Sequence, residues 1–181
     1  MGQILETERL ILRPFEEGDL DDVYRLIYSD VEVCRYYTDR QLSLEEMRER
    51  LTYRIPEARF SDFCRWAVVE REENRFLGLI GLEAGPNFWY RFKDDPNPRF
   101  NEVEVELSFA FGKEFWGRGY ATEASRKVIE YAFTELKIPR LVGGAAAENA
   151  RSVALQRRLG FRVEKEVGGE GYVTLLENDL I

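Results

Sequence analysis

Hydrophobic and polar residues alternate strictly along residues 102–111, where valine, leucine and phenylalanine occupy every second position and glutamates fill the first three positions between them. A period of two in residues of this kind predicts a half-buried β-strand. Between residues 121 and 132 small and apolar residues recur at spacings of three and four instead, which predicts one face of a helix. Gly117 and Gly119 stand between the two patterns. The centre of the chain is therefore predicted to form a strand, a glycine turn and a helix.

The rest of the chain continues the mixture of strands and helices. Further strands are predicted at residues 4–13, 65–69, 76–82 and 141–145, a terminal hairpin at residues 162–167 and 172–177, and helices from Gly18-Asp19, from Ser43 and from Asn149 to Leu159. Ser43 and Glu46 have the spacing of a capping box. Residues 84–99 follow no regular pattern and are a candidate functional loop. Without repeats, linkers or low-complexity tracts, residues 1–181 are predicted to form a single domain.

The glycine turn predicts an anion-binding site. Glycine lets the backbone approach a ligand closely, and the free N–H groups of a helix's first turn carry partial positive charge. Phosphate or pyrophosphate is the favoured ligand, and a simple tight turn is the alternative. No Lys-Ser or Lys-Thr pair follows the glycines, and Thr122 stands where a Rossmann motif has its third glycine. A nucleotide P-loop and a Rossmann site are therefore excluded.

Three motifs, in chain order, resemble those of one family. They are Thr7-Glu8-Arg9-Leu10-Ile11-Leu12-Arg13-Pro14, then Phe115-Trp116-Gly117-Arg118-Gly119-Tyr120-Ala121-Thr122-Glu123-Ala124, then Asn149-Ala150-Arg151-Ser152 with Leu159-Gly160-Phe161. They are similar to motifs of the GNAT superfamily of N-acetyltransferases, and most of all to its RimJ/RimL-type (ribosomal-protein-N-acetyltransferase-like) subgroup. The resemblance implies an α/β (α+β) GNAT fold: a central mixed, mostly antiparallel sheet, splayed at the acyl-CoA site and flanked by about four helices.

The resemblance also implies a donor and the residues that bind it. In this family an amine attacks the thioester of acetyl-CoA directly, so acetyl-CoA is implied and a metal is not. The glycine loop would bind the pyrophosphate, while the preceding strand and the start of the last helix would bind the pantetheine arm. The implied residues are Trp116, Gly117, Arg118, Gly119, Tyr120, Ala121 and Thr122 in the loop, Phe109, Ala110 and Phe111 in the strand, and Asn149 and Ser152 at the helix.

The chain contains no histidine, which excludes every Ser–His or Cys–His nucleophile–base pair. A general base must then be another group, such as a carboxylate, and neighbouring like charges favour proton uptake by a carboxylate. Glu106 is the first candidate for the base or the amine-binding anion, because it lies where the subgroup carries its strand glutamate, and Glu104 is the second. The alternative is an exposed carboxylate face that keeps the strand soluble.

The leaving thiolate needs a hydrogen bond or a proton. Many family members carry a tyrosine for this purpose, but Gln156 occupies that position in this chain. The resemblance implies that Ser152 faces the sulfur instead, as a hydrogen-bond donor. The alternative is that Ser152, in the first turn of its helix, satisfies free helix N–H groups.

The charge and composition of the chain narrow the range of binding partners and environments to expect. A net charge of −8 and a sequence pI near 4.9 argue against nucleic-acid binding and favour a cationic acceptor, although solubility alone explains an acidic surface equally well. No apolar run is long enough to span a membrane. Two widely separated cysteines, Cys34 and Cys64, are predicted to be packing residues in a reducing, cytoplasmic environment.

The family recognises its acceptor around the first two helices, which makes Tyr36 and Tyr37 candidates for substrate binding. Trp89 belongs to an aromatic cluster at residues 88–92 that is a candidate acceptor wall or homodimer contact. In both places the alternative is packing onto the core. The sequence thus predicts an acetyl-CoA-dependent N-acetyltransferase that acts on a primary amine, either a peptide N-terminus or a small amine. The alternative is a non-catalytic acyl-CoA-binding sensor or interaction module.

Overall fold

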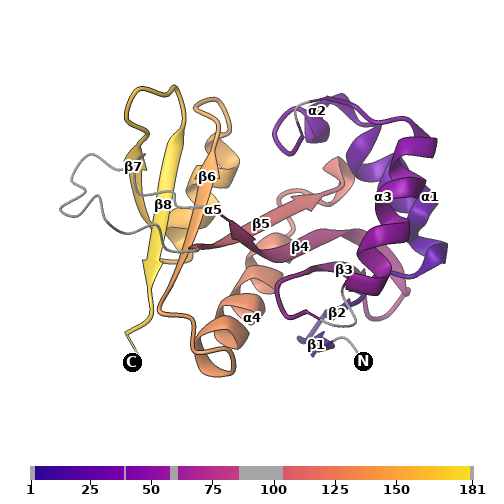
Figure 1. Cartoon of the computed structure of the whole chain (residues 1–181), viewed down its shortest axis with the longest axis horizontal. Helices are drawn as coiled ribbons and strands as arrows, with labels where there is room; N and C mark the ends of the chain where they lie inside the picture. Colours follow the sequence, from indigo (N-terminus) through magenta and orange to yellow (C-terminus); the bar gives the residue numbers. More distant parts are fainter. Residues whose placement is uncertain (1–2, 39, 58–60, 86–103, 180–181) are drawn as a thin grey trace. The chain divides into compact units, whose positions relative to one another are not determined.

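The computed structural model describes residues 3–38, 40–57, 61–85 and 104–179. The strands of this part form an eight-stranded sheet in the order β1-β2-β3-β4-β5-β6-β8-β7 (Figure 1). They are β1 (Leu5–Glu6), β2 (Leu10–Arg13), β3 (Arg65–Glu70), β4 (Arg75–Gly85), β5 (Glu104–Phe111), β6 (Arg140–Ala145), β7 (Arg162–Lys165) and β8 (Tyr172–Glu177). β5 and β6 pair in parallel, whereas β1–β2, β2–β3, β3–β4, β6–β8 and β7–β8 pair antiparallel. The predicted mixed, mostly antiparallel sheet is confirmed.

Helices precede β3 and follow β5 and β6. They are α1 (Leu20–Val23), α2 (Val31–Cys34), α3 (Leu44–Glu57), α4 (Tyr120–Thr134) and α5 (Ala150–Arg158), with 3-10 turns η1 (Glu17–Asp19) and η4 (Lys113–Phe115) and a π turn η2 (Tyr24–Tyr28). The capping box predicted for α3 is present, since the Ser43 amide donates to Glu46 Oε2 (2.8 Å) and the Glu46 amide donates to Ser43 Oγ (3.2 Å). None of the helices that the described residues form is both long and apolar enough to cross a membrane.

The single first strand predicted for residues 4–13 is wrong, because two short antiparallel strands, β1 and β2, occupy this segment. A turn separates them. The Thr7 amide donates to the Leu10 carbonyl oxygen (3.0 Å) and Thr7 Oγ1 accepts from the Leu10 amide (3.0 Å). The threonine side chain thus closes the turn between the two strands, as serine and threonine commonly do.

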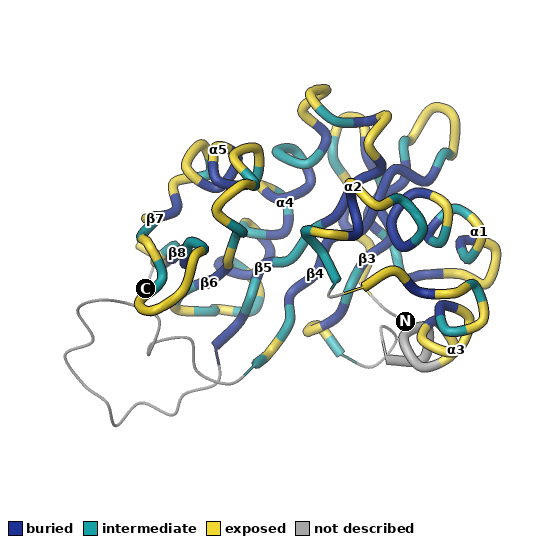
Figure 2. Tube along the Cα trace, turned by 90° about the horizontal axis from the view of Figure 1, so that it is seen from above, coloured by how far each residue is buried: buried dark blue, intermediate teal, exposed yellow. Residues whose placement is uncertain are grey.

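The chain divides into two compact units. The first unit comprises residues 1–82 and 108–128, and the second comprises residues 83–107 and 129–181. In the first unit, β3 and β4 are buried along most of their length (Figure 2), with Trp66 and Leu77 almost fully covered. In the second unit, Val142, Val173 and Leu175 form a buried cluster where β6 meets β8. The single-domain prediction stays a prediction.

Candidate functional site

The predicted anion cradle lies at the start of α4 in the first unit. Gly117 and Gly119 have φ angles of +76° and +84°, in the left-handed region that glycine tolerates best. A Cβ atom on Gly117 would meet nothing within 4 Å, so the backbone here borders open space. The Glu123 amide donates to the Gly119 carbonyl oxygen (3.0 Å), which is the first hydrogen bond of the helix. The N–H groups of the three residues between them therefore have no partner within the helix, which is the arrangement that binds anions.

The cradle is fixed to the end of β5. The indole Nε1–H of Trp116 donates to the carbonyl oxygen of Phe111, the last residue of that strand, over 2.8 Å. The next amide, that of Gly112, donates to the Leu77 carbonyl oxygen of β4 (3.0 Å). These two bonds hold the strand end and the glycine loop in one geometry. The residues predicted to contact pantetheine, Phe109 to Phe111, thus lead directly into the loop predicted to contact pyrophosphate.

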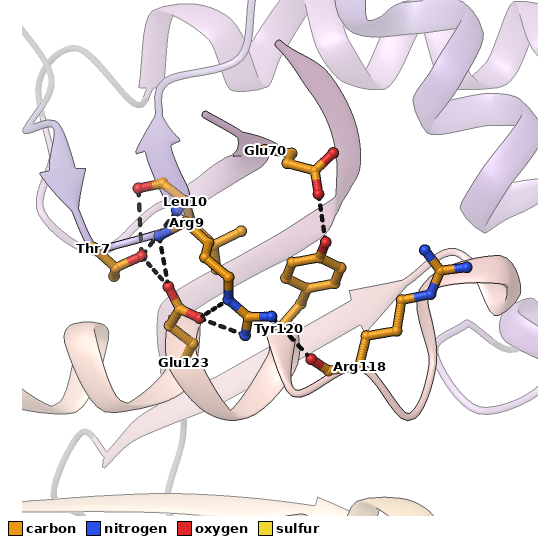
Figure 3. A network of polar contacts seen from close by, with 7 residues as sticks. All are labelled: Thr7, Arg9, Leu10, Glu70, Arg118, Tyr120 and Glu123. Carbon is orange, nitrogen blue, oxygen red and sulfur yellow. Dashed lines mark hydrogen bonds and ion pairs between the residues drawn. The ribbon is translucent and has the colours of Figure 1, made fainter. Parts of the chain in front are cut away.

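A polar network joins the turn between β1 and β2 to the first turn of α4 (Figure 3). Glu123 Oε1 accepts from Thr7 Oγ1 (2.6 Å) and from the Arg9 amide (3.0 Å), while Glu123 Oε2 accepts from Arg9 Nε (2.7 Å). Arg9 Nη1 also donates to the Arg118 carbonyl oxygen (3.1 Å), and the Arg9 guanidinium lies 4.6 Å from the centre of the Tyr120 ring. Arg9 therefore holds both the glycine loop and the helix that follows it.

This network decides the charge of Glu123. Burial raises the pKa of the Glu123 carboxyl, but the hydrogen bonds from Thr7 and Arg9 outweigh burial and the net shift of the pKa is downward. A carboxylate in the first turn of α4 would by itself repel a bound phosphate. The Arg9 guanidinium, with its Nη2 2.6 Å from Glu123 Oε2, neutralises that charge.

A second ion pair, between Glu70 and Arg75, lies at the hydroxyl end of Tyr120. The Tyr120 hydroxyl donates to Glu70, which also accepts from Arg75 Nη2 (2.7 Å). The hydrogen bond from Tyr120 lowers the pKa of Glu70 and raises the pKa of Tyr120, and the nearby charge of Arg118 lowers both pKa values. Figure 3 shows the Arg118 side chain extending away from the Arg9–Glu123 pair. Because each carboxylate already faces an arginine, the exposed Arg118 adds positive charge to the cradle.

In the second unit, Asn149 and Ser152 stand at the start of α5 as predicted. Asn149 is the N-cap: its Oδ1 accepts from the Ser152 amide (3.1 Å). The capping role that the sequence left open for Ser152 therefore belongs to Asn149. The Ser152 hydroxyl instead accepts a hydrogen bond from Gln156 Nε2 (3.1 Å), one turn later in the same helix.

The two candidate bases lie in different environments. The alternative of an exposed carboxylate face does not hold for Glu104, the second candidate base, because it is 3% exposed and accepts hydrogen bonds from Arg140 Nε at 3.1 and 3.0 Å. Arg140 begins β6, so the pair ties β6 to the start of β5. Glu106, two residues on, is half-buried and opposite Val142 in the parallel ladder. The more accessible of the two carboxylates is the first-choice candidate.

The acceptor candidates are described in part. The centre of the Tyr37 ring lies 6.0 Å from the centre of the Tyr28 ring. The Arg65 guanidinium lies 5.3 Å from the centre of the Tyr37 ring. Tyr36 is half-buried, and the Arg35 guanidinium lies 4.4 Å from the centre of its ring. Trp89 lies outside the described residues. No contact here assigns an acceptor role to either tyrosine, and all three stay predictions.

Several residues of these networks were not predicted as site residues. Arg9 belonged to a recognised motif, but its distance of 114 positions from Glu123 hid the contact. Glu70 carries no local signal, because it is one of two charged residues that flank the apolar run of β3.

Comparison with known proteins identifies the family. The model of the acetyltransferase (GNAT) domain matches residues 9–162. The chain belongs to the GNAT family. It is an acetyl-CoA-dependent N-acetyltransferase, in keeping with the relatives that it matches. The resemblance drawn from the three sequence motifs is confirmed.

Two relatives and one solved structure illustrate the match. YdaF of Bacillus subtilis, named as a candidate ribosomal N-acetyltransferase, is 38% identical over 129 residues, covering 67% of this chain and 68% of its own length. The spermidine N(1)-acetyltransferase of Escherichia coli is 27% identical over 168 residues, covering 90% of this chain and 77% of its own. A GNAT-family acetyltransferase from Bacillus anthracis superposes with a TM-score of 0.77 at 21% identity, covering 98% and 99% of the two chains, and it shares the fold.

Proposed function

We propose that this chain transfers the acetyl group of acetyl-CoA to a primary amine, with the amine attacking the thioester directly while both substrates are bound. The observation that carries the donor assignment is the cradle at Gly117–Thr122. It combines open backbone, the N–H groups of the helix's first turn and an exposed arginine, with the acidic side chain of that turn, Glu123, neutralised by Arg9. This donor set fits a pyrophosphate.

The residues of the second unit would serve the acetyl transfer itself. As the C–N bond forms and the C–S bond breaks, the amine loses a proton and the electron pair leaves on sulfur. Glu106 is proposed to take the proton, directly or through water. Ser152 is proposed to donate a hydrogen bond to the leaving sulfur, and Asn149 to bind the pantetheine arm through its side-chain amide. No acyl-enzyme is required, which suits a chain without histidine.

The need for a base depends on the acceptor. An α-amino group with a pKa of about 7.7–8.0 costs only ~1–1.4 kcal/mol to deprotonate at neutral pH, whereas an alkylamine near ~10.4 costs about 4–5 kcal/mol. A net charge of −8 supports a cationic acceptor in either case. The relatives' names point to both classes, a peptide N-terminus and a polyamine. We therefore propose a peptide N-terminus or a small amine as the acceptor.

A competition among amines tests the proposal. Purified protein is incubated with acetyl-CoA and a panel that contains peptides with a free N-terminus, the same peptides with a blocked N-terminus but a free lysine, and spermidine. Mass spectrometry then locates the acetyl group. Acetylation of one amine class supports the proposal and names the acceptor. Absence of product with every amine, despite CoA binding, would favour the acyl-CoA-binding sensor instead.

A further inference from the structure

Ser152 is connected to a chain of hydrogen bonds that crosses the second unit. Gln156, 3% exposed, donates from Nε2 to the Ser152 hydroxyl (3.1 Å) and to the Gly144 carbonyl oxygen (3.2 Å), and its Oε1 accepts from the Thr174 hydroxyl. Thr174 is fully buried on β8. This series of hydrogen bonds thus leads from Thr174 on β8, through Gln156 on α5, to Ser152, the residue proposed to face the leaving sulfur.

The direction of every bond in this chain is determined. The Gly144 carbonyl oxygen can only accept, so the amide nitrogen of Gln156, not its oxygen, must face it. The amide oxygen then faces Thr174, whose hydroxyl must donate. The second amide hydrogen faces Ser152, whose oxygen must accept. The single hydroxyl hydrogen of Ser152 is therefore left to point away from Gln156.

The adjoining strand leaves room for this arrangement. Gly143 lies directly opposite Thr174 in the β6–β8 ladder. A Cβ atom at position 143 would lie 2.9 Å from Thr174 Oγ1 and 3.1 Å from Gln156 Oε1, against both ends of one hydrogen bond. A side chain there would push the bonded atoms apart. The two glycines of β6 thus have separate roles. Gly143 leaves room for the Thr174–Gln156 hydrogen bond, and the carbonyl oxygen of Gly144 accepts a hydrogen bond from Gln156.

We propose that Thr174 and Gln156 are positioning residues that hold the Ser152 hydroxyl as a donor toward the leaving sulfur of acetyl-CoA. The proposal rests on the function proposed above. Without these hydrogen bonds, nothing in the Thr174–Gln156 pair would orient the Ser152 hydroxyl. With them, the hydroxyl hydrogen is available at the moment the thiolate forms, and no reorganisation is needed.

A double-mutant cycle tests the proposal. Thr174→Val removes the donor at nearly constant volume, Thr174→Ser retains it, and Ser152→Ala removes the terminal hydroxyl. We expect Ser152→Ala to lower kcat about tenfold and Thr174→Val about threefold, with Thr174→Ser near the wild type. In the Ser152→Ala background, Thr174→Val should lower kcat no further. An equal loss in both backgrounds would overturn the proposal, because Thr174 would then act only on structure.

A measurement without turnover keeps this test separate from the proposed function. The pKa of the thiol of bound CoA can be followed through the ultraviolet absorbance of the thiolate. It should rise in Ser152→Ala and in Thr174→Val, and should rise no further in the double variant. Unchanged values would overturn the proposal even if the wild type acetylates an amine, whereas a wild type that acetylates no amine overturns only the proposed function. If Thr174→Val does not fold, Gly143→Ala perturbs the same bond and should raise the same pKa.

Discussion

Arg9 and Glu123, 114 positions apart in sequence, are joined at Oε2 by Arg9 Nε at 2.7 Å and Nη2 at 2.6 Å. The pair lies beside the glycine loop, because Arg9 Nη1 also holds the Arg118 carbonyl oxygen. It therefore does two things for an anion at the start of α4: it cancels an opposing charge and it fixes the loop.

Arg9→Ala should raise the Kd for CoA by about tenfold, since a carboxylate close to the pyrophosphate loses its partner. Isothermal titration measures the change. Removing the carboxylate as well, in Arg9→Ala with Glu123→Ala, should recover part of the affinity. Arg162→Ala, which removes a partly exposed ion pair with Glu164 (2.9 Å), is the control and should bind CoA as the wild type does. Equal affinities of all four proteins would contradict the role of Arg9.

Gly117 can be tested against a closely matched glycine. Gly117 and Gly168 have φ angles of +76° and +72°, and a Cβ on either would meet nothing within 4 Å. Alanine at each should therefore cost a similar stability, about 1–2 kcal/mol from the left-handed conformation. Only Gly117→Ala should weaken CoA binding, because only that Cβ would stand in the cradle. If the two variants bind CoA equally well, the cradle is misassigned.

The lowered pKa of Glu123 has a consequence for stability. A carboxyl whose pKa is lower in the folded state stabilises the fold above its unfolded pKa of about 4.3, and the stabilisation is lost as the pH falls through the folded value. The difference in unfolding free energy between the wild type and Glu123→Gln should therefore be largest near neutral pH and shrink below about pH 4. Denaturant titrations at a series of pH values measure it, with the exposed Glu148→Gln as control. A difference that does not vary with pH would contradict the downward shift.

Replacing Glu104 or Glu106 by glutamine should affect different properties of the protein: stability for Glu104 and catalysis for Glu106. Glu104→Gln breaks a buried ion pair and should cost about 3 kcal/mol of stability. Glu106→Gln should leave CoA binding intact but lower kcat, and more so for spermidine than for a peptide α-amine, because the more basic amine must lose a more tightly held proton. Denaturation curves and kinetics on the two amines separate these effects. Full activity of Glu106→Gln on both amines would exclude it as the base.

Local patterns predicted the elements better than they predicted the environment of single residues. The alternation before the glycines and the helical period after them placed β5, the loop and α4, because each depends on neighbours in sequence. The Ser43–Glu46 box placed the start of α3 for the same reason. The burial of Glu104 could not be predicted, because Arg140 is 36 positions away and only the sheet brings the two together. The turn at Thr7 was missed for a different reason, since the side-chain hydrogen bond that closes it leaves no hydrophobic pattern in the sequence.

In the candidate site, too, local motifs could be predicted and contacts between distant residues could not. Gly117, Gly119, Asn149 and Ser152 could be selected as candidates because they belong to short motifs. Some of the residues that hold them lie far away in the sequence, as Arg9 and Thr174 do, and any polar residue there is an equally good candidate from sequence alone. Contacts made by the fold therefore supply what the motifs leave out.

The most direct test of acetyl transfer is the release of free thiol from acetyl-CoA, followed with and without an amine acceptor while CoA binding is measured on the same preparation. The account predicts that CoA binds, that thiol release depends on the amine, and that one acetylated amine appears for each thiol released. CoA binding with no amine-dependent thiol release would contradict catalysis, and failure to bind CoA would contradict the cradle itself.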